Sequence, residues 1–60
     1  MSQIWNFNNG EDVAKIKEII SFRHPSNMTS WPDDYTIKLD GEVHNQTALV
    51  LKQCGAKRID

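Results

Sequence analysis

One cysteine, two histidines and a pair of aspartates give this 60-residue chain the residue types of a thiol triad. Cys54 could act as the nucleophile, His24 or His44 as the base, and Asp33 or Asp34 as the orienting acid. A triad also needs an oxyanion hole, a supporting shell and a substrate cleft, and one small core hardly provides these. Free cysteine is among the most buried residue types, so we expect Cys54 to be buried and inert at a helix end. The sequence therefore predicts a protein that is not an enzyme.

The same side chains are poorly spaced for a metal. Structural zinc sites pair their ligands about two to four residues apart, and His24, His44 and Cys54 form no such pair. We expect both histidines on the surface. The three glycines stand alone, each explained by a turn or a helix cap, so no phosphate-binding loop is predicted either. We expect no metal and no cofactor.

Length and composition place the chain in one class. Sixty residues allow a single domain, 1–60, with one small hydrophobic core. Charged residues make up 25% and the net charge is −1, so the chain exerts no long-range attraction on nucleic acid or anionic lipid. A single cysteine and the lack of a basic-then-apolar leader favour a cytoplasmic setting, and no apolar run is long enough to span a membrane.

The first half of the chain predicts a strand and a helix. Residues 2–7 alternate, with Trp5 and Phe7 on one face. A helix follows at about 11–23 and stops before Pro25, because the residue preceding a proline is pushed out of helical geometry. Its apolar residues fall on one arc at 3.6 residues per turn; they are Val13, Ile16, Ile19 and Ile20.

The second half is less regular. Residues 35–39 alternate as a strand, and Asp40-Gly41 signals a hairpin, for which a three-residue loop, 40–42, keeps the apolar register. Residues 45–54 fit either a helix capped by Asn45 or a short buried strand, and the end signals favour the helix. Residues 56–59 read as a final strand. The predicted fold is α+β: one mostly antiparallel sheet of three to four strands, covered by the helix at about 11–23 and by a second short helix at about 46–54.

A long polar connection, 24–34, is the most conspicuous segment. Part of it could form one helical turn capped by Ser30 or Trp31. Trp31 has two interpretations: a lid over the sheet, or an exposed anchor for a partner, and both hold if one ring face is buried and the other exposed. The predicted partner-binding residues are Met28, Trp31, Asp33 and Asp34.

We therefore expect a non-enzymatic, cytoplasmic protein-binding module that acts as an inhibitor, adaptor or modulator of a partner protein by surface contact. Inhibitors encoded by mobile elements such as phages are often this small. The alternative is a nucleic-acid-associated regulatory factor that uses the basic C-terminal end, Lys52, Lys57 and Arg58. A homodimer formed through an open sheet edge is a third hypothesis.

Overall fold

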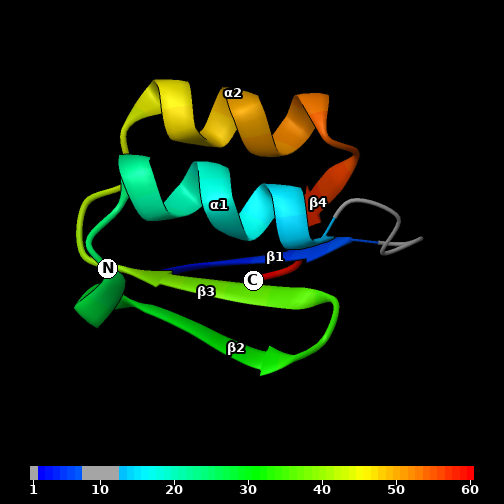
Figure 1. Ribbon diagram of the computed structural model, residues 1–60, viewed down its shortest axis with the longest axis horizontal. Coiled ribbons are helices and arrows are strands. Elements are labelled where there is room, and N and C mark those ends of the chain that lie inside the picture. Colours follow the sequence, from blue (N-terminus) through cyan, green and yellow to red (C-terminus); the bar gives the residue numbers. More distant parts are fainter. Residues whose placement is uncertain (1, 8–12) are drawn as a thin grey trace.

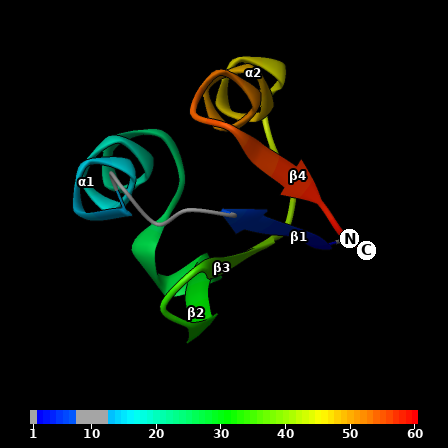
Figure 2. The same cartoon turned by 90° about the vertical axis from the view of Figure 1, so that its right-hand side faces the viewer.

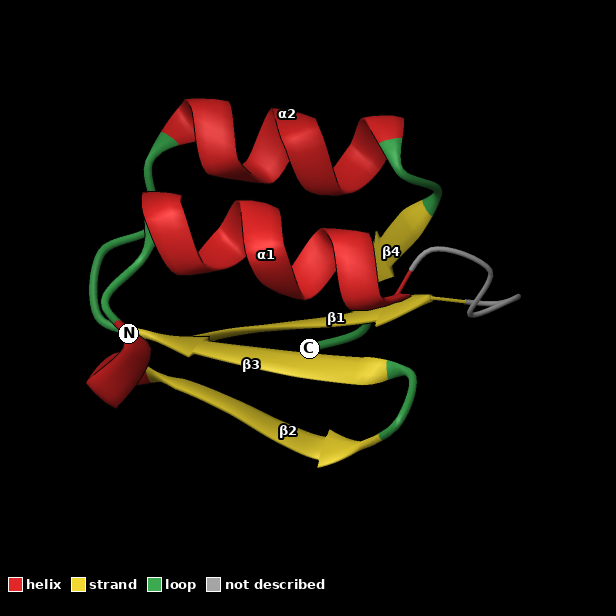
Figure 3. Cartoon of the chain, viewed as in Figure 1, coloured by secondary structure: helices red, strands yellow, loops and turns green. Residues whose placement is uncertain are grey.

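The computed structural model describes residues 2–7 and 13–60. Figure 3 shows the helices α1 and α2 packed on a sheet. The elements are β1 (Ser2–Phe7), α1 (Val13–Arg23), the short 3-10 helix η1 (Ser26–Met28), β2 (Thr29–Asp33), β3 (Thr36–Asp40), α2 (Asn45–Gln53) and β4 (Ala56–Arg58). The predicted α+β class is confirmed, as are the strands at each end of the chain.

The strands form one antiparallel sheet in the order β2-β3-β1-β4 among the residues described. Both helices lie on the same face of this sheet, as Figures 1 and 2 show. Each helix links two strands that are separated by a third, which is the split βαβ connectivity of ferredoxin-like folds. The central strands are β1 and β3, and the two edges are β2 and β4.

The core lies between the helices and the inner face of the sheet. Strand alternation places Trp5 and Phe7 of β1 on this face, as the sequence predicts, and both are buried. Helix α1 contributes Ile16 and Ile20, and α2 contributes Leu51 beside the buried Thr47. The buried hydrophobic set is Trp5, Phe7, Ile16, Ile20, Ile37, Leu39, Leu51 and Ala56.

The helices end where the sequence indicates. The last helical bond of α1 runs from the His24 N–H to the Ile20 carbonyl, just before the proline. The start predicted for α1 near residue 11 lies outside the described residues. The helix predicted for residues 45–54 is confirmed as α2, with Cys54 as its C-cap, and Gly55 (φ +86°) follows. Asn45 is the first helical residue of α2 rather than its cap, which is His44. Neither α1 nor α2 has the length and apolarity that crossing a membrane requires.

The hairpin predicted at Asp40-Gly41 is wrong. Gly41 has a φ of +77°, which a side chain would disfavour, and it turns the chain out of the sheet toward α2. The hairpin partner of β3 is instead β2, through the turn at Asp34 and Tyr35. Tyr35 therefore lies in a turn and is half exposed rather than in a strand.

The long connection predicted over 24–34 is also wrong. It contains η1 and then a complete edge strand, and the single helical turn precedes the tryptophan instead of following it. Strand β2 carries a bulge between Ser30 and Asp33, so it does not alternate regularly. Pro32 is tolerated there because an edge strand does not need every N–H for the ladder. These two features gave the segment the composition of a loop.

Candidate functional site

Trp31 lies in the middle of edge strand β2 and is both packed and accessible. Its ring stacks on the buried Phe7 ring, with centroids 6.2 Å apart and planes 23° from parallel. The Lys17 ammonium of α1 lies 4.8 Å from the Trp31 centroid, within cation–π range. The side chain is partly buried against the core. Trp31 thus supplements the core while part of its ring stays open to solvent.

A concave surface adjoins this tryptophan. A groove of about 250 Å³ separates α1 from β2, and its residues are Lys17, Ile20, Ser21, Ser26, Thr29 and Trp31. It combines apolar surface with hydroxyl groups and one cation. Such a groove can take an apolar side chain and hold a polar group at its rim.

The backbone of β2 also has free hydrogen-bonding capacity. The Phe7 N–H donates to the Tyr35 carbonyl at 2.8 Å, so the backbone N–H and C=O groups of Tyr35 and of every second residue of β3 point toward β1. The backbone groups of the remaining residues of β3 point toward β2. One of these others pairs with Ser30. The Trp31 N–H and the carbonyl of Thr29 therefore point away from the sheet. These groups can pair with an extended segment of another chain.

The other predicted partner-binding residues lie at the two ends of β2. Met28 is 42% exposed and lies beside Gly41, where its Sδ is 3.2 Å from the position a Cβ would take. Asp33 is part of the turn, because its Oδ1 accepts the Tyr35 N–H at 2.8 Å. Asp34 is exposed in that turn. We call Met28, Trp31, Asp33 and Asp34 the β2 strip, since they follow one strand instead of clustering at a loop tip.

The basic residues predicted at the C-terminal end border a second concavity. A groove of about 610 Å³ lies between α2 and the β1–β4 edge, and Lys52, Lys57 and Arg58 all border it. Arg58 pairs with Trp5 in the ladder, so its side chain lies on the helix side of the sheet. Lys57 pairs with the next residue of β1, and alternation directs its side chain to the opposite face. Lys52 and Arg58 thus share the groove, whereas the Lys57 side chain lies on the other face of the sheet, so the three do not form one continuous patch.

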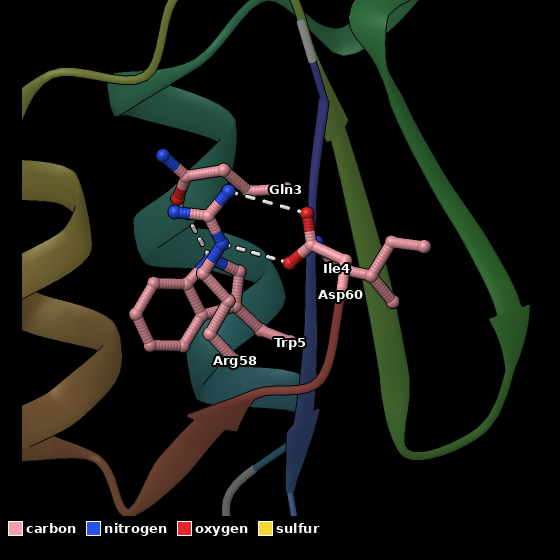
Figure 4. Close-up of polar contacts among 5 residues, drawn as sticks. All are labelled: Gln3, Ile4, Trp5, Arg58 and Asp60. Carbon is pink, nitrogen blue, oxygen red and sulfur yellow. Dashed lines mark hydrogen bonds and ion pairs between the residues drawn. The ribbon is translucent and has the colours of Figure 1, made fainter.

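Arg58 forms an ion pair with Asp60 across this edge. Its Nε and Nη2 donate to the two carboxylate oxygens at 2.7 and 3.2 Å, and the Ile4 N–H donates to Asp60 Oδ1 at 3.2 Å (Figure 4). These bonds lower the pKa of Asp60 to about 2, with the Arg58 bond as the largest cause. The same bond raises the pKa of Arg58. Much of the guanidinium charge is therefore already compensated within the chain.

Sequence reasoning missed two residues of this groove, Gln3 and Trp5, and also Asp60, the ion-pair partner of Arg58. The Trp5 Nε1 donates to Gln3 Oε1 at 3.0 Å, across two positions of the same strand (Figure 4). The alternation of β1 already placed both side chains on one face. The pairing of β4 with β1, which brings Arg58 next to these two side chains, depends on the order of strands in the sheet, and no local sequence pattern indicates that order.

His24 and Cys54 lie in different surroundings. His24 is 4% exposed, and one of its ring nitrogens, Nε2, lies 2.8 Å from the Asp40 carbonyl, so the predicted surface position is wrong. The ring fills the space where α1 meets the end of β3. Cys54 is exposed, not buried, because it caps α2 on the solvent side. Among residues 2–7 and 13–60, no cluster of three potential ligands could hold a metal ion.

Comparison with protein-family models, curated proteins and solved structures finds no match to this chain. The ferredoxin-like connectivity carries many unrelated functions and so indicates none. The functional argument therefore rests on the chemistry of the two surfaces, the β2 strip with its groove and the groove beside β4.

Proposed function

We propose that the chain is a non-enzymatic module that binds a partner protein by surface contact at the β2 strip. One observation carries this proposal: Trp31 is a partly buried tryptophan on a strand that pairs on one side only among the described residues, and it lies beside a groove. Tryptophan is enriched among interface hot spots, and truncating one commonly costs about 2 kcal/mol or more of binding free energy.

The residues of the β2 strip have different proposed roles in binding. Trp31 anchors the partner, and Met28 at one end adds a flexible apolar contact. At the other end, the exposed Asp34 steers a basic patch of the partner toward the site. Binding there covers partner surface sterically, which is how an inhibitor, adaptor or modulator of this size acts. A reducing cytoplasm is the proposed setting, supported by the unpaired, exposed Cys54.

The nucleic-acid alternative has one supporting observation, the grouping of Lys52, Lys57 and Arg58 around a single groove. Two observations weigh against it. Asp60 compensates Arg58, and the aromatic side chains of β1 and β2 turn toward the helices, away from the open sheet face where bases stack in sheet-type RNA binders. It remains the second candidate.

The test is affinity capture from native cell extract, read by mass spectrometry, with three baits. Wild type is compared with Trp31→Ala and with Phe22→Ala, each shown to be folded by circular dichroism. Phe22 is the matched control because it is a large aromatic residue, 86% exposed, on the outer side of α1. We expect one protein that wild type and Phe22→Ala retain and Trp31→Ala loses.

Capture of the same protein by all three baits contradicts the proposal. Capture of nucleic acid instead, with affinity that falls steeply as salt rises, favours the alternative. Capture of a second copy of the chain that depends on Trp31 makes the β2 edge a homodimer interface, and wild type then elutes as a dimer in size-exclusion chromatography.

A further inference from the structure

The groove beside β4 is continuous with a second recess. The recess has a volume of about 530 Å³ and shares Gln3 and Arg58 with the groove of about 610 Å³. Together they extend along α2 from its N-terminal connection, at Gly41–Val43, to Lys52 near its C-terminal end. It is larger than the groove beside Trp31, and no residue of the β2 strip lines it.

Three of the side chains that line this surface offer hydrogen-bond donors. Gln3 has its amide oxygen engaged by the Trp5 indole N–H, and its amide nitrogen donates to no other residue of the described chain. Arg58 and Lys52 carry only donors. A ligand that fits these groups must supply acceptors.

The guanidinium is also fixed in place. Asp60 holds Nε and Nη2 of Arg58, and Nη1 makes no bond to another residue in the described part of the chain. Figure 4 shows Gln3, Trp5 and Arg58 on the same side of β1. The charged side chains on the helix side of this surface are Lys52 and Arg58, with Asp60 and, at the recess, Glu42. Asp60 is paired with Arg58, whereas Lys52 forms no ion pair with another residue of the described chain.

We propose that this groove binds a small molecule through a phosphate or carboxylate group. The oxyanion accepts hydrogen bonds from Arg58 Nη1 and the Gln3 amide, and Lys52 contributes charge. The inference does not depend on the proposed partner-binding function, because this surface shares no lining residue with the groove beside Trp31.

The test is a nuclear magnetic resonance titration of the full chain, with inorganic phosphate and acetate as separate probes at constant pH and ionic strength. The reporters are the Gln3 side-chain amide and the Arg58 Nε–H. We expect shifts that saturate, and an affinity about tenfold lower in Lys52→Gln and Arg58→Gln, because each removes a charged donor. Lys15→Gln is the matched control, since Lys15 is exposed on α1, and it should bind as wild type does.

The probes separate the sources of the oxyanion. Saturable binding of phosphate alone assigns a phosphorylated ligand, and equal binding of acetate assigns a carboxylate. Shifts that rise linearly without saturating, or that persist unchanged in Lys52→Gln, overturn the proposal. Lys52 is exposed on α2, so that variant keeps the test decisive even if Arg58→Gln disturbs the packing over Trp5.

Discussion

The two tryptophans of this chain lie on the same face of one sheet and meet different surroundings. Trp5 is on central strand β1, is 2% exposed, and donates its indole N–H to Gln3. Trp31 is on edge strand β2, is only partly buried, and its indole N–H has no partner within the described part of the chain. A fully buried tryptophan usually satisfies this donor.

Position in the sheet explains the difference. A central strand has a neighbour on each side and a helix above, so its large side chains are sealed. An edge strand has one neighbour, and Lys17 covers Trp31 without enclosing it. The same residue type therefore serves the core at β1 and is available to a partner at β2.

The largest expected effect on stability comes from replacing Trp5, the buried tryptophan. Trp5→Ala should lower the free energy of unfolding by about 3–5 kcal/mol, because it leaves a cavity under α2. A domain of this size has total stability of that order, so we expect little folded protein. Urea unfolding followed by circular dichroism measures this, with Trp5→Phe as the milder control. If Trp5→Ala unfolded cooperatively at the same urea concentration as wild type, the claim that Trp5 is a buried core residue would be contradicted.

Replacing His24 should have the next largest effect on stability, because its side chain connects the end of α1 to the end of β3. His24→Ala leaves the Asp40 carbonyl without its side-chain partner and should cost about 1–3 kcal/mol. The same unfolding assay applies. His44→Ala is the control; His44 is exposed, and its loss should change stability by less than about 0.5 kcal/mol.

Trp31→Ala should destabilise the fold less than either. Losing the stacking on Phe7 and the contact with Lys17 should cost about 1–2 kcal/mol, so the variant stays folded. The unfolding midpoint in urea checks this, beside Phe22→Ala, which should match wild type. A loss as large as that of Trp5→Ala would mean that Trp31 is a core residue and would remove the basis for its role as an anchor.

The smallest effect concerns the pH dependence at the β4 edge. Folding lowers the pKa of Asp60 from 3.8 to about 2, so its charged form stabilises the fold above pH 3.8 and this contribution is lost as the pH falls toward 2. The difference in unfolding free energy between wild type and Asp60→Asn should therefore shrink on acidification. It should be small and weaken in salt, because the pair is exposed. A difference that grows in acid would contradict the Arg58 pairing.

Local patterns were sufficient where one feature decides the structure. The apolar arc of α1, the alternation of β1 and the glycine after α2 each depend on a few neighbouring residues. Strand β2 could not be predicted in this way, because Pro32, the bulge and the polar residues around Trp31 are typical of a loop, and only pairing with β3 makes them a strand. The burial of His24 and the meeting of Arg58 with Gln3 likewise depend on contacts between distant parts of the chain.

The most direct test of the central claim is hydrogen exchange at single backbone amides, with and without the captured partner. The outward-facing Trp31 N–H of β2 should exchange quickly in the free chain and become protected in the complex, while the amide of Arg58 in β4 should not change. Protection confined to β4 and α2, with Trp31 unaffected, would contradict the assignment of the partner site to the β2 strip.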